Sequence, residues 1–456
     1  MAVVVLLVAV VAGCSSSETP KPTMAPGQGL AGDWNGVLAL PDKQLPVGVT
    51  FAKDVAAVTV PDQGIYDQPA TGVSTDPNNI TFTVPGIPGV PNFKGRYDSD
   101  TITGTFSQSG NQWPLTMRRG AVPTPPRPQE PKPPWPYKSE DVTYRSGDIT
   151  IAGTLTLPGA PGPYPAVVLI TGSGAQDRNE EVFGHKPFLL IADTLTKAGY
   201  AVLRTDDRGI GGTGGKLSTA DYTDLSNDVV AGLTFLRGRT DIDRTRIGLL
   251  GHSEGGYLAP LVASRPDSGV AFVIMMAGPA ASGSDVLLEQ NQVLLRAQGA
   301  SPEEIQKQIE FVSTLTTLIR TGDMDQVRRY IHDHNTPLPV DQQIPDAGAD
   351  FYTSPYFASF IDYDPTPALK ALRVPVLAFY GTKDLQVPPA QSEPLARQDL
   401  AADPDADVHV FDGLNHLMQP ANTGLPTEYG TIETTIAPEV LYYITAWLTK
   451  RFPPAR

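Results

Sequence analysis

Hydrophobic and polar residues change their rhythm along the chain, and the first regular pattern lies between residues 29 and 120. Short stretches that alternate apolar and polar side chains are separated here by Gly, Pro, Asn and Asp. Alternation with a period of two is typical of strands with one buried face. Strands are expected from Trp34 to Leu40, Val47 to Phe51, Ala56 to Val60, Ile80 to Val84, Phe93 to Tyr97, Thr101 to Phe106 and Trp113 to Met117. Residues 29–120 are therefore predicted to form a small all-β domain, an antiparallel sandwich or barrel.

A second kind of segment follows. Val122 to Tyr137 contains eight prolines, including Pro125-Pro126 and Pro133-Pro134. Proline-rich chain adopts an extended, semi-rigid conformation without internal hydrogen bonds. Residues 121–138 are therefore expected to be a solvated linker.

From residue 139 to 456, apolar runs alternate with amphipathic stretches. Expected strands are Asp141 to Arg145, Thr150 to Leu157, Ala166 to Thr171, Ala201 to Thr205, Arg246 to Leu250, Ala271 to Met276, Pro375 to Tyr380 and Asp407 to Phe411. Expected helices are His185 to Lys197, Tyr222 to Arg237, Gly255 to Ala263, Pro389 to Leu400 and Pro438 to Phe452. This order predicts an α/β domain with a mostly parallel sheet covered by helices on both faces.

A long insertion, about 284–372, interrupts that alternation. It contains three amphipathic stretches, Val286 to Gln298, Pro302 to Arg320 and Met324 to His332, and then a proline-rich return to the sheet. Ligands bind at the carboxyl ends of the strands in open α/β sheets. The insertion is therefore predicted to be a helical cap over that edge.

The beginning of the chain predicts secretion. Ala2 to Gly13 is an uninterrupted run of 12 small or apolar residues, too short to span a bilayer but suited to a signal peptide. It ends in Val11-Ala12-Gly13-Cys14, which resembles the bacterial lipobox, and residues 14–28 are rich in Ser and Pro. Residues 1–13 are interpreted as a signal peptide and 14–28 as a tether lipidated at Cys14, holding the protein at the outer face of a bacterial cell membrane. A buried Cys14 in a strand is the alternative. A signal peptide usually has basic residues before its apolar run, but the first basic residue of this chain is Lys21.

Composition narrows the classes of function. The chain of 456 residues is 40% hydrophobic and 18% charged, with a formal net charge of −15, so binding to nucleic acid is disfavoured. The single cysteine excludes an intramolecular disulfide or a cysteine metal cluster. His332 and His334 have a metal-like spacing but no third ligand nearby, and Gly209 to Gly212 lacks the ending of a phosphate loop. Neither a metal nor a cofactor is expected, and the sequence does not indicate the oligomeric state.

The most informative motif is Gly251-His252-Ser253-Glu254-Gly255, which lies between an expected strand and an expected helix. The pattern G-x-S-x-G in that setting indicates a nucleophile elbow, in which Ser253 takes a strained backbone conformation. Gly251 and Gly255 permit the tight turn. A glycine-rich turn with a bystander serine is the alternative, since the pattern without its setting is weak.

A serine needs a positioned base, and in this arrangement the acid and then the histidine follow the nucleophile. His416 comes directly after the last expected strand, whereas His409 lies within it and His332 and His334 lie in the cap. Asp384 follows the preceding strand, while its rivals Asp362 and Asp364 precede that strand. The predicted set is therefore Ser253, Asp384 and His416, with Asp384 holding the tautomer of the imidazole.

An oxyanion formed at such a serine needs backbone donors. One is expected to be the amide of Glu254, and the other the amide of Ser173 in the glycine-rich stretch Thr171 to Gly174. The Glu254 carboxylate could be a third acid, but its place at a helix N-terminus explains it without catalysis. Asp206 and Arg208 are expected to fix the loop that follows their strand.

The motifs together resemble the α/β-hydrolase superfamily from about Pro133 to the C-terminus. The stretches Gly172 to Asn179, Asp206 to Gly211 and Gly251 to Gly256, with Asp362-Tyr363-Asp364-Pro365, are similar to those of a group of bacterial carboxylesterases. The resemblance implies hydrolysis of small-molecule acyl esters by a Ser-His-Asp triad, in a protein that often carries an accessory β domain.

Two other functions stay open at this point. Related hydrolases with caps cleave short peptides, and such a peptidase would need a site for the substrate amine, at Glu254 or at cap carboxylates. A surface-binding lipoprotein with an inactive hydrolase domain is the second, although Ser253, Asp384 and His416 are all present.

Overall fold

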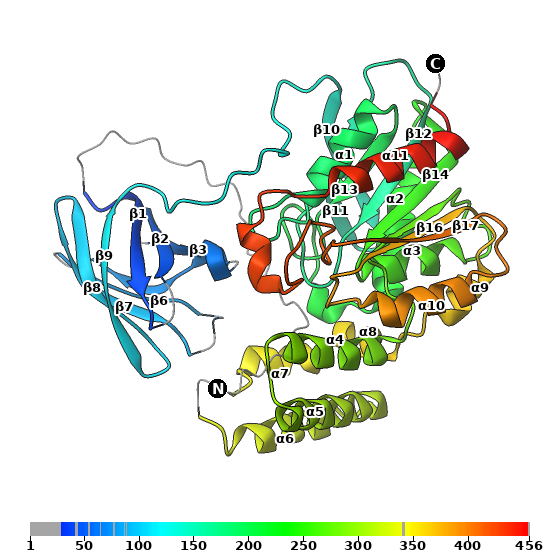
Figure 1. The fold of residues 1–456 in the computed structure, drawn as a ribbon. Helices are drawn as coiled ribbons and strands as arrows, with labels where there is room; N and C mark the ends of the chain where they lie inside the picture. Colours follow the sequence, from blue (N-terminus) through cyan, green and yellow to red (C-terminus); the bar gives the residue numbers. More distant parts are fainter. Residues whose placement is uncertain are drawn as a thin grey trace.

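The computed structural model describes residues 29–454 except for 42–43, 53–54, 64, 76–77, 86, 88 and 340–342. In these residues the chain forms a sheet of nine strands, a sheet of eight and a group of helices below the second sheet (Figure 1). The signal peptide, the tether and Cys14 expected from the sequence lie outside the described residues. Within the described ranges, no helix is both long and apolar enough to cross a membrane.

The nine-stranded sheet is antiparallel throughout and occupies the first part of the chain. Its strands are β1 (Gly32–Ala39), β2 (Gln44–Ala52), β3 (Val55–Val60), β4 (Ile65–Pro69), β5 (Thr71–Ser74), β6 (Asn79–Thr83), β7 (Asn92–Asp98), β8 (Thr101–Gln108) and β9 (Asn111–Arg119). The order is β4-β3-β2-β1-β9-β8-β7-β6-β5, and β5 also contacts β3, so the sheet curves round on itself. Trp34, Phe51, Phe82 and Phe93 fill its interior. The all-β character predicted from the alternation is confirmed.

Two strands of this sheet, β4 and β5, are not predicted by the sequence pattern. Neither strand contains a fully buried residue. Without an apolar face there is no alternation to detect, because the pattern arises only where one face packs on a core.

The eight-stranded sheet is mostly parallel. Its strands are β10 (Lys138–Ser146), β11 (Ile149–Leu157), β12 (Tyr164–Ile170), β13 (Ala201–Thr205), β14 (Ile242–His252), β15 (Val273–Met276), β16 (Val376–Gly381) and β17 (Ala406–Phe411), in the order β10-β11-β13-β12-β14-β15-β16-β17. The pairs β10–β11 and β11–β13 are antiparallel, and the remaining pairs are parallel. The central strands are buried on both faces, which explains their continuous apolar runs.

Helices cover both faces of this sheet, as predicted. They are α1 (Pro187–Lys197), α2 (Tyr222–Arg237), α3 (Gly255–Ala263), α10 (Pro389–Asp399) and α11 (Pro438–Arg451), with the 3₁₀ helices η2 (Leu217–Thr219) and η4 (Pro426–Thr431). The apolar residues of α1 and α11 pack with Val167, Leu169 and Val202 on one face. Those of α2, α3 and α10 pack with Ala166 and Val168 on the other.

Most of the insertion forms a layer of helices below the sheet in Figure 1, and its last helix lies beside α10. Its helices are α4 (Gly283–Ala297), α5 (Pro302–Thr321), α6 (Met324–Asn335), α7 (Asp346–Tyr352), α8 (Pro355–Asp362) and α9 (Thr366–Ala371). The last three occupy the stretch expected to be a proline-rich return. Pro355 and the prolines beside α7 and α9 lie at helix starts, where a missing N–H costs nothing, so they begin helices instead of preventing them.

The expected linker is hydrogen-bonded to the α/β part through Arg127. The guanidinium of Arg127 donates to the carbonyls of Gly184 and Phe183 (3.2 and 2.9 Å) and to those of Gly430 and Ile432 (2.8 and 2.9 Å). Arg127 thus anchors this stretch to four backbone carbonyls of the α/β part, while most residues of 121–138 are exposed or half-buried.

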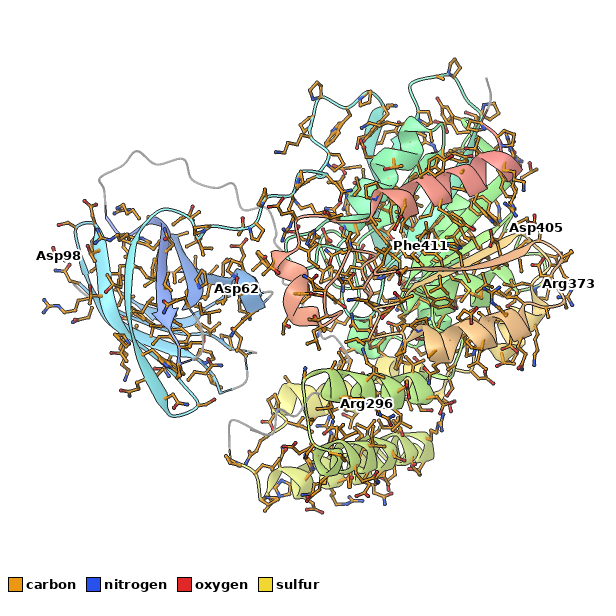
Figure 2. All side chains as sticks on the ribbon, in the orientation of Figure 1. Asp62, Asp98, Arg296, Arg373, Asp405 and Phe411 are labelled. Atoms are coloured by element: carbon orange, nitrogen blue, oxygen red, sulfur yellow. The ribbon has the colours of Figure 1, made fainter. Side chains whose placement is uncertain are left out.

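The all-β part and the α/β part meet near the residues that bind Arg127. The 3₁₀ helix η1 (Pro61–Gln63) contacts η4, and Figure 2 shows Asp62 at the edge of the all-β part that faces the α/β part. The two parts are thus joined both by covalent chain and by a direct contact.

Candidate active site

Ser253 lies in the turn between β14 and α3. Its φ angle is 52°, in the left-handed region that non-glycine residues rarely occupy. Its backbone N–H donates to the carbonyl of Met276 on β15 (3.0 Å), and its carbonyl accepts from the N–H of Gly256 (2.8 Å). The strained conformation expected of a nucleophile elbow is present, and the two hydrogen bonds hold it in place.

The glycines of the motif are required by close packing of backbone. A Cβ on Gly251 would lie 2.0 Å from the carbonyl oxygen of Gly255, and one on Gly255 would lie 2.2 Å from that of Ile170. A side chain at Gly251 would clash with backbone inside the turn itself, and one at Gly255 would force the turn away from β12. These two glycines let the elbow approach the neighbouring strand.

Asp384 and His416 form a buried pair. The Nδ1 atom of His416 lies 2.8 Å from Oδ2 of Asp384, and the two residues are 4% and 1% exposed. The other oxygen of Asp384 accepts the backbone N–H groups of Gln386 and Val387, both at 2.8 Å. The carboxylate is therefore fixed, and a ring that donates from Nδ1 keeps Nε2 free to take a proton.

His416 also lies beside the elbow. Its carbonyl is 3.1 Å from Nε2 of His252, the residue before Ser253, and the two imidazole rings are 4.9 Å apart between centroids. The structure thus brings the loop that carries His416 against the turn that carries Ser253.

A second buried pair, Glu180 and His252, was not identified from the sequence. Nδ1 of His252 lies 2.9 Å from Oε1 of Glu180, and both residues are almost completely buried. Burial lowers the pKa of His252, but the Glu180 carboxylate outweighs this, and the net direction is upward. Both ring nitrogens face acceptors, Glu180 and the carbonyl of His416, an arrangement that favours the protonated ring.

The loop after β12 is held by side chains at alternate amides. The N–H of Gly172 donates to Glu180 (2.6 Å), that of Gly174 to the hydroxyl of Tyr356 (2.9 Å), and that of Gln176 to Asp207 (2.9 Å). Within the described part of the chain, the amides of Ser173 and Glu254 have no such acceptor. These are the two amides expected to bind an oxyanion.

Asp207 anchors this loop at both ends. Its carboxyl group also accepts from Oγ1 of Thr171 (2.9 Å), and desolvation raises its pKa well above the usual range. The neighbouring Asp206 binds the guanidinium of Arg178 (3.0 and 2.7 Å), and Arg208 binds Asp228 (2.6 Å). Asp206 and Arg208 thus fix loops, as expected from the sequence.

The side chain of Glu254 corrects one expectation. It makes no capping hydrogen bond at the start of α3, so placement at a helix N-terminus does not explain it. Instead, its carboxylate accepts from the hydroxyl of Tyr222 (2.7 Å) and from that of Tyr356. Burial raises its pKa from 4.5 to about 7, against the two phenol hydrogen bonds, which lower it.

This pKa predicts a pH dependence of stability. A carboxyl group with a higher pKa in the folded state contributes stability that is present below its unfolded pKa and lost as the pH rises to its folded pKa. For Glu254 the window runs from 4.5 to about 7, which corresponds to roughly 3 kcal/mol. The free energy of unfolding of Glu254→Gln, taken relative to that of the wild type, is therefore expected to rise by about this amount between pH 4.5 and pH 7.5.

Denaturant unfolding at the two pH values checks this prediction. The control is Glu439→Gln, at an exposed position of α11, for which the same difference should stay within about 0.5 kcal/mol. A difference for Glu254→Gln no larger than that of the control would show that Glu254 does not titrate in this window.

The other candidates from the sequence lie away from this site. His409 packs against the ring of Tyr443 (4.7 Å between centroids), and His334 packs against Phe311 (4.0 Å). Asp362 has an 80% exposed side chain, and Asp364 accepts from the N–H of Thr366 (2.9 Å). Among the described residues, no group of three or more His, Cys, Asp or Glu side chains could hold a metal ion.

Comparisons of its sequence and fold with known proteins find relatives of this chain. Residues 167–423 match the model of a family described as the alpha/beta hydrolase family. The chain is 29% identical over 315 residues to esterase EstD of Thermotoga maritima, covering 68% of each chain. The putative hydrolase YtaP of Bacillus subtilis is 30% identical over 122 residues, covering 23% of this chain and 41% of that protein. A solved esterase of Pyrococcus furiosus is 14% identical, with a TM-score of 0.45, and the match covers 72% of this chain and 98% of that one.

Proposed function

Because this chain belongs to the alpha/beta hydrolase family, we propose that it is a hydrolase that cleaves carboxylic acyl esters through a Ser253-His416-Asp384 triad. The observation that carries the proposal is the buried Asp384–His416 pair, 2.8 Å apart, in which the loop of His416 packs against the strained turn of Ser253. The similarity to an esterase over 68% of the chain supports the choice of substrate class.

The proposed mechanism gives each of these donors and acceptors a role. Nε2 of His416 takes the proton of the Ser253 hydroxyl as Oγ attacks the ester carbonyl. The amides of Ser173 and Glu254 bind the resulting oxyanion. The imidazolium, stabilised by Asp384, returns the proton to the leaving alcohol, and water then releases the acid by the same steps in reverse order.

A direct comparison of substrates tests the proposed class. We expect turnover of p-nitrophenyl acetate or butyrate, and little hydrolysis of an aminoacyl p-nitroanilide. The reason is that Glu254, the acid considered for an amine site, is buried and already accepts two phenol hydroxyls. Faster hydrolysis of the anilide would instead favour the peptidase, and an acyl-length series would then define the chain preference of whichever activity is found.

We also propose that the mature protein is anchored by lipid at Cys14. The support is the apolar run that ends at Gly13 and the lipobox-like residues before Cys14. Expressed in a bacterium fed labelled palmitate, the full chain should incorporate label and partition into the detergent phase of Triton X-114. Cys14→Ala should do neither, and incorporation by the alanine variant would exclude Cys14 as the acceptor.

A further inference from the structure

Tyr356 connects the cap to two parts of the site. It is the second residue of α8 and is 2% exposed. Its hydroxyl accepts the N–H of Gly174 (2.9 Å) in the loop after β12 and donates to the carboxylate of Glu254 in the elbow. A single hydroxyl group of the cap therefore lies between the loop and the elbow.

The two partners of Tyr356 are placed at the expected oxyanion donors. Gly174 directly follows Ser173, and Glu254 carries the second donor amide on its own backbone. An oxyanion site works only if both donors lie 2.7–3.1 Å from the developing charge. Anything that sets the distance between Gly174 and Glu254 also sets the distance between the two donors.

Hydrogen bonds from side chains hold the loop in position. A cavity of about 60 Å³ adjoins it, and Gly172, Gly174, Glu254 and Tyr356 are among its lining residues. Asp207 holds the ends of the loop and Glu180 holds Gly172, so Tyr356 provides the hydrogen bond at Gly174. Without its hydroxyl, Gly174 would lose this partner beside an unfilled space.

At the elbow, the Glu254 carboxylate is also fixed by hydrogen bonds. Glu254 is buried, no cation is among its hydrogen-bond partners in the described part of the chain, and its carboxylate is stabilised by the hydroxyls of Tyr222 and Tyr356. Tyr222, on α2, contacts only the Glu254 end of this arrangement through its hydroxyl. Tyr356 is the residue that bridges both ends.

We propose that Tyr356 is a positioning residue for the reaction: its hydroxyl fixes the spacing of the Ser173 and Glu254 amides, so that cap helix α8 completes the oxyanion site. The inference rests on the proposed function. It assigns to the cap a role in transition-state stabilisation besides covering the sheet edge.

The test is Tyr356→Phe, measured in the full chain with p-nitrophenyl butyrate. The oxyanion exists only after attack, so kcat should fall about 10- to 100-fold while KM changes less than about twofold. The control is Tyr352→Phe, because Tyr352 is also buried in the cap, where its ring packs against Phe357 (5.2 Å between centroids). This control should keep kcat within about twofold.

A third variant separates bridging from simple stabilisation of Glu254. Tyr222→Phe removes the other hydrogen bond to the same carboxylate but leaves the link to Gly174 intact. Its loss in kcat should be clearly smaller than that of Tyr356→Phe. Equal losses, or a Tyr356→Phe variant that behaves as Tyr352→Phe, would overturn the proposal.

If Tyr356→Phe does not fold, Glu254→Gln and Glu254→Leu give an independent test. Both remove the charge, but only glutamine retains polar atoms that can hydrogen-bond with the Tyr356 hydroxyl. Leucine should lower kcat at least threefold more than glutamine does, whereas equal values would contradict the bridge. Failure of the proposed function is distinguishable, because the wild type itself would then fail to hydrolyse p-nitrophenyl butyrate.

Discussion

Ser253→Ala is expected to lower kcat for ester hydrolysis by about three decades or more. Alanine removes the only atom that can form the acyl-enzyme, while the oxyanion donors and the Asp384–His416 pair remain. The turn should persist, because the hydrogen bonds that hold residue 253 are made by its backbone N–H and carbonyl (3.0 and 2.8 Å). The measurement is kcat on p-nitrophenyl butyrate, with labelling by a fluorophosphonate probe as a second readout.

Ser264→Ala is the matched control for this experiment. Ser264 follows the last turn of α3, where its hydroxyl donates to the carbonyl of Leu261 (3.1 Å). We expect it to retain activity and labelling. Ester hydrolysis that survives in Ser253→Ala would refute the triad, and a folded wild type without labelling would favour a binding protein with an inactive hydrolase domain.

Much of the fold follows from periodicity and local start signals. The α/β fold with an N-terminal all-β part is confirmed. Helix α2 begins where predicted because Asp221 caps it and Asp224 completes the capping box. The buried strands read as apolar runs because helices cover both faces of their sheet.

The parts of the fold that could not be predicted lack these signals. Strands β4 and β5 have no buried face, and α7 to α9 are short helices whose prolines suggest a loop until their positions at helix starts are known. Interactions between distant segments are harder still. Glu180 meets His252, and Tyr356 meets Gly174, across 72 and 182 residues of sequence.

Some residues of the candidate site were predicted from the sequence, and others were identified only in the folded structure. Order along the chain predicted Asp384 and His416, because the acid and the histidine follow successive strands of such a sheet. The structure places them 2.8 Å apart, and their catalytic roles stay predictions. No spacing rule pointed to Glu180 or Tyr356, because their function depends on which backbone amide each one reaches in the folded chain.

Asp384→Asn should be about as damaging as loss of the nucleophile, with kcat falling by about three to four decades. In the wild type, Oδ1 of Asp384 accepts two backbone N–H groups at 2.8 Å, and Oδ2 faces Nδ1 of His416. An asparagine must keep its oxygen on the two amides, because turning its NH₂ group toward them would leave donors facing donors. The NH₂ group would then face Nδ1 and force it to be an acceptor.

That tautomer carries its proton on Nε2, so the imidazole could no longer take one from Ser253. The fold should be retained, because the two backbone hydrogen bonds to residue 384 survive. Asp362→Asn is the matched control, since Asp362 is the rival acid from the sequence and its side chain is 80% exposed; we expect it to keep kcat within about twofold. The check is kcat for both variants together with the rate of fluorophosphonate labelling, which should fall with kcat in Asp384→Asn. If Asp384→Asn stayed within tenfold of the wild type, the acid of the triad would have to be another residue.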